Sequence, residues 1–229
     1  AIEDGAADFA VLPIENSTAG AVDEMYDLLV EFENYIVGET VIPIRHTLSG
    51  LPGASLEEVK TVYSKGVALM QATHFLDAHS SWQRINVANT AIAAKKVVED
   101  QDPSQAAVCS VYAAKVHGLQ VLADNINDNE HNSTRFIVVT NQKIFLKHAS
   151  KISICLEVSH ESGSLYRVLS HFIYNDLNMT KIESRPIEGR DWEYRFFIDF
   201  EGNMADGAVK NAIRGLREEC RNLRILGNY

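Results

Sequence analysis

The C-terminal third of the chain is centred on NMTKIESRPIEGRDWEYRFFIDF, residues 178–200. Two strand-like runs, 179–187 and 193–200, flank a turn at 188–191, and this pattern predicts a β-hairpin. A strand and a helix are predicted before the hairpin, and a helix and a strand after it, at 151–159, 163–177, 206–220 and 223–229. The order βαββαβ predicts a ferredoxin-like fold, with two helices on one face of a four-stranded antiparallel sheet.

The preceding part, residues 1–148, alternates short apolar strands with helices. Strands are expected at 9–14, 36–44, 59–64, 106–110 and 136–140, with helices at 22–32, 67–79, 89–100 and after Ser110. Such alternation predicts an α/β domain with a mostly parallel sheet, in which ligands bind beyond the carboxyl ends of strands. We therefore predict two domains, 1–148 and 149–229, with a hinge at 141–150.

Composition narrows the possible partners. The formal net charge of −10 and pI near 5.2 disfavour nucleic acid, because such a surface repels phosphate. No apolar run is long enough to span a bilayer, and no signal peptide is visible. Three distant cysteines without a CxxC pair predict a reduced, cytoplasmic protein. The sequence has no phosphate-binding loop or metal-ligand spacing, so no cofactor and no metal are expected.

Four polar groups stand where predicted strands or helices begin or end. They are Glu15-Asn16-Ser17-Thr18, the pair Ser64 and Gln71, Asn89-Thr90-Ala91, and Thr134-Arg135-Phe136. Each has an ordinary alternative as a helix cap, a turn residue or a solvated side chain. Gln71 follows Ser64 by two helical turns, which places both on one face if the helix is continuous. Together, the hydroxyls, amides and single guanidinium suit binding of a carboxylate-rich small molecule and donation of one proton.

Thr134 and Arg135 cannot both enter one cleft from a regular strand, since adjacent residues face opposite ways. We expect either an irregular strand start or an Arg135 that supports the site from outside. Ionised Glu15 is expected to orient another group, because it would repel a substrate carboxylate.

The motifs LPIENSTAG (12–20), NSTRF (132–136), ESGSLYRVL (161–169) and NMTKIESRPI (178–187) occur in an order that resembles prephenate dehydratase with a C-terminal ACT domain. The resemblance covers essentially the whole chain. It implies a two-lobed, periplasmic-binding-protein-like catalytic domain that converts prephenate to phenylpyruvate without a cofactor. Thr134 matches the residue tied most closely to catalysis. The other matching positions are Glu15, Asn16, Ser17, Ser64, Gln71, Arg135 and Phe136, with His46 and Thr90 as further substrate contacts.

The same resemblance implies feedback inhibition by phenylalanine, bound by the ACT domain at a dimer interface. The matching positions are Gly163, Ser164, Leu165, Asn178, Glu183, Ser184, Arg185 and Pro186. Exposed N–H groups at the predicted helix start would attract the ligand carboxylate. A homodimer or homotetramer is expected, with neither nucleic acid nor membrane as a partner.

The chain departs from the family in three places. The family's opening glycine-rich segment is absent, so the catalytic domain is expected to be incomplete at its N-terminus. Lys65-Gly66 replace the usual His-Pro, and Asn89 replaces a serine. Three alternatives stay open: arogenate as the substrate, a catalytically silent phenylalanine-binding module, and a two-lobed solute-binding protein.

Overall fold

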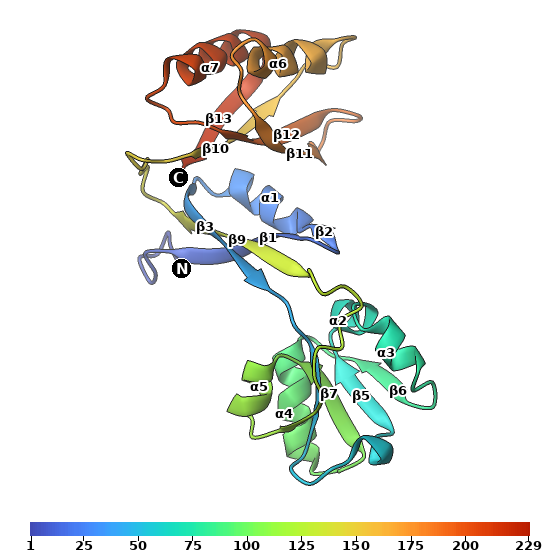
Figure 1. Cartoon of the computed structure of the whole chain (residues 1–229). Coiled ribbons are helices and arrows are strands. Elements are labelled where there is room, and N and C mark those ends of the chain that lie inside the picture. Colours follow the sequence, from blue (N-terminus) through green and yellow to red (C-terminus); the bar gives the residue numbers. More distant parts are fainter. The chain divides into compact units, whose positions relative to one another are not determined.

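The computed structural model describes residues 1–229 as an α/β protein with mixed sheets (Figure 1). The chain forms two compact units. The first comprises residues 1–16, 20–41 and 135–229, and the second comprises 17–19 and 42–134. No helix combines the length and the apolar character needed to cross a bilayer.

The first unit is built on one eight-stranded sheet, in the order β11-β12-β10-β13-β3-β9-β1-β2. Its elements are β1 (Ala10–Asn16), β2 (Gly20–Ala21), α1 (Asp23–Glu31), β3 (Tyr35–Pro43), β9 (Ser133–Thr140), β10 (Lys151–Glu157), α6 (Ser164–Ile173), β11 (Met179–Pro186), β12 (Tyr194–Glu201), α7 (Gly207–Glu219) and β13 (Arg221–Asn228). Ile14, Leu29 and Ile137 bring β1, α1 and β9 into one apolar core, as their predicted patterns require.

The C-terminal elements follow the predicted βαββαβ order. β10 pairs antiparallel with both β12 and β13, and β11 pairs antiparallel with β12. Helices α6 and α7 lie together on one face of these strands (Figure 1). Phe172 of α6 meets Phe200 of β12 edge-on, with ring centroids 5.1 Å apart, in the core beneath them. The apolar stripes of the two helices therefore cover this sheet as predicted.

Glu157, at the end of β10, is the one carboxylate among the fully buried polar residues. It accepts hydrogen bonds from Arg195 at 2.7 Å, Asn222 at 3.0 Å and Arg190 at 3.2 Å. Burial raises the pKa of Glu157, but the bonds from Arg195 and Asn222 and the guanidinium charges outweigh it. The pKa therefore lies below its ordinary value of 4.5.

Because the folded pKa is depressed, Glu157 contributes stability above its unfolded pKa and loses that contribution as the pH falls through the folded value. We expect Glu157→Gln to lower the free energy of unfolding by about 1–3 kcal/mol at pH 7. The difference from the wild type should shrink steadily as the pH falls below 4.5. Urea unfolding at several pH values measures it, and a difference independent of pH would contradict the assignment.

β13 joins β3 through a close parallel contact between Gly227 and Ile36. A Cβ on Gly227 would lie 2.2 Å from the carbonyl oxygen of Ile36, which is backbone and cannot rotate away. The packing of the C-terminal strand on the N-terminal strands therefore requires glycine at this position.

We expect Gly227→Ala to lower the free energy of unfolding by about 2 kcal/mol or more, as overpacking does in a filled core. Gly207→Ala is the matched control, because a Cβ on Gly207, the first residue of α7, meets no atom within 4 Å. Urea unfolding of both full-length variants measures the difference. Equal stabilities would show that the contact does not constrain the fold.

The second unit contains β4 (Thr47–Gly50), the 3-10 helix η1 (Leu56–Glu58), β5 (Thr61–Ser64), α2 (Gly66–Met70), α3 (Thr73–Asp77), β6 (Gln83–Asn86), α4 (Thr90–Asp100), β7 (Gln105–Cys109), α5 (Val111–Val116) and β8 (Gln120–Ala123). Its sheet has the order β6-β5-β7-β4-β8. β5 is parallel to β6 and β7, whereas β4 is antiparallel to β7 and β8. The prediction of a mostly parallel sheet is therefore wrong, because the fully buried β4 was not recognised as a strand.

The helix predicted over 67–79 is two short helices, α2 and α3, separated at Gln71 and Ala72. α3 begins as a separate helix at Thr73. The Asp128 carboxylate caps it by accepting hydrogen bonds from the backbone N–H groups of Thr73 and His74, both at 2.9 Å. The two-turn argument that placed Ser64 and Gln71 on one helical face therefore fails. Asn89 caps α4 as predicted, accepting from the N–H of Ile92.

The division of the chain at residue 148 remains a prediction. The C-terminal βαββαβ segment begins at β10, two residues after the predicted boundary. However, the first unit also includes residues 1–16 and 20–41, which contact that segment. The contacts that join them are described below, because they involve the predicted site residues.

Candidate active site

Two of the predicted motifs meet at the end of β1 and the start of β9. The N–H of Ser17 donates to the carbonyl oxygen of Ser133 at 2.9 Å, and the N–H of Ser133 donates to the Ser17 hydroxyl oxygen, also at 2.9 Å. The Ser17 hydroxyl lies 3.3 Å from the carbonyl oxygen of His131. Thr134 therefore directly follows Ser133, whose backbone N–H and carbonyl groups are both hydrogen-bonded to Ser17 of the first motif. Ser17 does not cap α1, whose N-cap residue is Val22, so the capping alternative is wrong for it.

His46 and Gln71, predicted separately, also come together. His46 Nε2 lies 2.9 Å from Gln71 Oε1. The backbone around His46 is held by Asn127, whose amide accepts from the N–H of His46 at 2.6 Å and donates to the carbonyl oxygen of Ile44 at 3.0 Å. His46 is buried, so this bond fixes both its ring and the Gln71 amide.

Asn127 and Asp128 are functional candidates that the sequence reasoning missed. Both lie in the Asn-rich loop, residues 125–132, that precedes β9. The loop builds the His46–Gln71 pair, because the N–H of Asp128 donates to the carbonyl oxygen of Gln71 at 2.8 Å while its carboxylate caps α3. Their partners lie more than fifty residues away, so no local pattern in the sequence marks them.

Ser64 and Thr90 occupy positions that the local secondary structure explains. Ser64 is fully buried, and its hydroxyl donates to the carbonyl oxygen of Val108 at 2.6 Å. Thr90 is the first residue of α4, directly after the Asn89 cap, and is half-buried. Asn16 and Phe136 are half-buried in β1 and β9. A direct substrate contact of these four residues remains a prediction.

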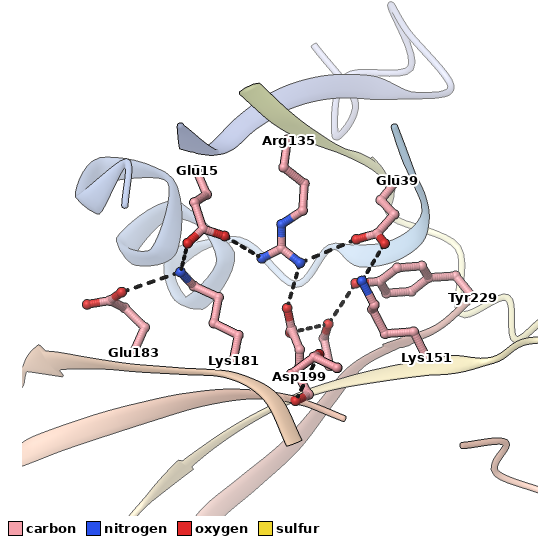
Figure 2. A network of polar contacts seen from close by, with 10 residues as sticks. Glu15, Glu39, Arg135, Lys151, Lys181, Glu183, Asp199 and Tyr229 are labelled. Carbon is pink, nitrogen blue, oxygen red and sulfur yellow. Dashed lines mark hydrogen bonds and ion pairs between the residues drawn. The ribbon is translucent and has the colours of Figure 1, made fainter. Parts of the chain in front are cut away.

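The Arg135 guanidinium is paired with three carboxylates of the chain (Figure 2). Its Nη1 lies 2.9 Å from Asp199 and 3.4 Å from Glu39, and its Nη2 lies 3.3 Å from Glu15. Burial opposes the charge, but Asp199 attracts and hydrogen-bonds the guanidinium strongly enough to raise the pKa of Arg135. β9 is a strand from Ser133 onward, and this arrangement fits the second expectation, an Arg135 that supports the site from outside.

Glu15 likewise contacts cations of the chain. Its carboxylate accepts from Lys181 at 2.7 Å and also pairs with Arg135. This fits the expectation that Glu15 orients another group.

Comparison with known proteins shows what these motifs belong to. The model of the family described as prephenate dehydratase matches residues 1–144. The chain belongs to the prephenate dehydratase family. A bifunctional chorismate mutase/prephenate dehydratase from Aquifex aeolicus (strain VF5) is 39% identical over 230 residues, covering 100% of this chain and 62% of that protein. Arogenate dehydratase/prephenate dehydratase 6, chloroplastic, from Arabidopsis thaliana is 36% identical over 246 residues, covering 100% of this chain and 60% of that protein.

Solved structures of similar sequence agree with this chain in fold. Prephenate dehydratase from Arthrobacter aurescens in complex with L-Phe is 32% identical, with a TM-score of 0.91, covering 100% of this chain and 76% of that one. A chain described as GqqA, a novel type of quorum quenching acylase, is 30% identical, with a TM-score of 0.87, covering 99% and 82%. This chain spans less than two thirds of the length of the curated relatives described above.

The predicted regulatory residues fall into two groups. Ser164 and Leu165, at the start of α6, line a cavity of about 390 Å³ whose other walls include the aromatic rings of Trp192, Tyr194 and Phe196. Gly163 precedes α6 with a φ of 79°, a left-handed conformation that favours glycine. The aromatic walls were not predicted, because the turn before β12 offered no local signal of a cavity.

The second group, on β11, does not line that cavity. Arg185 forms a fork on α1, with Nη1 2.7 Å from Asp23 and Nη2 2.7 Å from Asp27. The hydrogen bond to Asp27 is the main cause of the raised pKa of Arg185. Glu183 lies 3.6 Å from Lys181 on the same face of the strand, whereas Ser184 and Pro186 are exposed. Asn178 is exposed just before β11. Ligand contacts of this group remain predictions.

Proposed function

We propose that the protein containing this chain is a prephenate dehydratase, a lyase that forms phenylpyruvate from prephenate on the route to phenylalanine. The observation that carries the proposal is the double hydrogen bond between Ser17 and Ser133, which joins the two motifs and fixes Thr134 beside them. The relatives named above support the proposal, since the Aquifex aeolicus and Arthrobacter aurescens proteins are named for this activity.

The reaction needs a proton donor more than a nucleophile. The C–C bond to one carboxylate of prephenate breaks and releases CO₂, and its electron pair moves through the ring and expels the ring hydroxyl. That hydroxyl leaves as water once it takes a proton. The Thr134 hydroxyl is the donor in this proposal, and solvent returns its proton. A positioned general acid contributes about 10²–10⁴-fold to a rate.

The carboxylates of prephenate need fixed hydrogen-bond donors. Asn16 and Gln71 supply amides, and the bond from His46 to Gln71 Oε1 orients the Gln71 amide. Arg135 is not assigned to a substrate carboxylate here, because three carboxylates of the chain already surround it. An arogenate substrate would add an ammonium group, and the Arabidopsis thaliana relative is named for both substrates.

Residues 149–229 serve in this proposal as an ACT domain that binds phenylalanine and inhibits turnover. The cavity beside Ser164 and Leu165 has aromatic walls for a phenyl ring and the N-terminus of α6 for a carboxylate. The L-Phe complex of the Arthrobacter aurescens relative supports this assignment. A two-lobed catalytic domain, a homodimer or homotetramer and a cytoplasmic location complete the proposal.

Turnover of prephenate and of arogenate by the full-length protein, measured side by side, tests the proposal. Phenylpyruvate from prephenate is the expected result, and faster turnover of arogenate would reassign the substrate. Turnover of neither substrate, with phenylalanine still bound, would leave a silent phenylalanine-binding module. Acylase activity, which the name of the GqqA structure suggests, should be absent from the same preparation.

A further inference from the structure

Three consecutive residues of the Asn-rich loop hold both members of the His46–Gln71 pair. The N–H of Ile126 donates to the carbonyl oxygen of His46 at 3.0 Å, and the side-chain oxygen of Asn127 accepts from the N–H of His46 at 2.6 Å. The N–H of Asp128 donates to the carbonyl oxygen of Gln71 at 2.8 Å. One short segment therefore fixes the backbone of two site residues that are 25 positions apart in the sequence.

The segment 126–128 is itself anchored, so it can act as a fixed support. Ile126 is 5% exposed and packs in the apolar core that also contains Ala68 of α2 and Leu76 of α3. The Asn127 amide donates to the carbonyl oxygen of Ile44 at 3.0 Å while its oxygen accepts from the histidine N–H. An amide that donates and accepts at once is fixed in rotation, because exchanging its oxygen and nitrogen would break both bonds.

Asp128 determines where Gln71 lies, because it bonds to both sides of the junction between α2 and α3. Gln71 is the C-cap of α2, and its carbonyl oxygen is held by the N–H of Asp128. The Asp128 carboxylate, 22% exposed, accepts from the N–H groups of Thr73 and His74 at the start of α3. Gln71 therefore cannot rotate into one continuous helix without loss of bonds on both sides of the junction.

The orientation of the Gln71 amide follows from these supports. Gln71 Oε1 can only accept, so His46 Nε2, 2.9 Å away, carries the proton of this bond. The bond turns the amide NH₂ away from the ring, toward the substrate carboxylate of the proposed reaction. Because both side chains extend from backbone that the loop holds, a shift of the loop would move this donor.

We infer that Asn127 and Asp128 are positioning residues of the substrate site. Asn127 sets the position of His46, Asp128 sets that of Gln71, and the bond between the two orients the amide that binds the substrate carboxylate. Neither Asn127 nor Asp128 contacts the substrate itself. The inference rests on the proposed function and deepens it. It involves only residues 44–128, which lie within the range that the family model matches.

Asn127→Ala and Asp128→Ala in the full-length protein test the inference. Each is expected to lower kcat/KM for prephenate by about 5- to 30-fold, since small displacements of a positioning group have effects of this order. Neither should exceed the loss in Gln71→Ala, because a displaced amide loses at most its whole bond to the substrate. Asp128→Asn keeps an acceptor oxygen for the start of α3 and should recover most of the lost rate.

Asn127→Asp replaces Asn127→Ala if that variant does not fold. It keeps an acceptor for the N–H of His46 but cannot donate to the carbonyl oxygen of Ile44, so a loss of similar size is expected. Wild-type kcat/KM in the Asn127 and Asp128 variants would overturn the inference.

Asp102→Ala is the matched control for a lost carboxylate. Asp102 lies in the turn before β7, where one carboxylate oxygen accepts from the N–H of Ser104 at 2.9 Å and from its hydroxyl at 2.8 Å. The substitution removes support for the backbone in the same unit, as Asp128→Ala does, but away from His46 and Gln71. Urea unfolding should show that both variants lose stability, whereas only Asp128→Ala should lower kcat/KM. An equal loss of kcat/KM in Asp102→Ala would overturn the positioning role.

Double mutants separate positioning from general damage to the fold. If Asn127 and Asp128 act through Gln71, adding either alanine substitution to Gln71→Ala should lower kcat/KM by less than about a further twofold. Full multiplication of the separate losses would overturn the inference. An inactive wild type would instead refute the proposed function.

Discussion

Thr134→Ala is expected to lower the turnover of prephenate at least about a hundredfold, the lower range for a lost general acid. In the proposed reaction Thr134 supplies the proton that the departing hydroxyl needs, and alanine at the same strand position supplies none. The N–H and carbonyl groups of β9 are unchanged by the substitution, so the strand should persist. Phenylalanine binding should be unaffected, because the cavity at α6 shares no residue with this motif.

Thr134→Ser is the matched control, because it keeps the hydroxyl and removes only a methyl group. Steady-state kinetics with prephenate and calorimetric titration with phenylalanine measure the two effects. Near-normal turnover of Thr134→Ala, or an equal loss in Thr134→Ser, would contradict the role of the hydroxyl as proton donor.

Gln71→Ala should lower kcat/KM for prephenate by about 10- to 100-fold, since a hydrogen bond to a charged group contributes about 1.5–3 kcal/mol. The oriented amide donates to a substrate carboxylate in the proposed site. Gln71→Glu should be at least as harmful, because it places a negative charge where a carboxylate binds. It retains an acceptor for His46, so the pair with His46 should survive.

Gln83→Ala, on the exposed surface of β6, is the control for a lost glutamine and should be neutral. The same kinetic assay measures all three variants. A Gln71→Glu variant as active as the wild type would show that Gln71 does not contact a carboxylate.

The sequence predicted those elements whose apolar spacing is unambiguous. The βαββαβ order of residues 151–228 was predictable because α6 and α7 each carry one apolar stripe and the strands between them are rich in β-branched and aromatic residues. The β4 strand was not predictable, because Thr47, Ser49 and Gly50 resemble a loop. Its buried hydroxyls find hydrogen-bond partners only in the folded chain: Thr47 and Ser49 bond to each other, and Thr47 lies 3.1 Å from the carbonyl oxygen of Cys109.

The sequence predicted the site residues that belong to a family motif. It did not predict the residues that are distant in the sequence and hold those motif residues through hydrogen bonds or ion pairs. His46 and Gln71 were found separately, but Asn127, which holds His46, has no local signature. Asp199 and Lys181 are more than sixty and more than a hundred residues from the partners they hold, so only the folded chain brings them together.

In the proposed function, one protein both converts prephenate and senses phenylalanine. Phenylpyruvate formation by the full-length wild-type protein, titrated with phenylalanine, tests it most directly. We predict turnover that falls as phenylalanine is added, while tyrosine at equal concentration, with its added hydroxyl, inhibits less. Absence of phenylpyruvate at every phenylalanine concentration would contradict the catalytic half of the account, and turnover indifferent to phenylalanine would contradict the regulatory half.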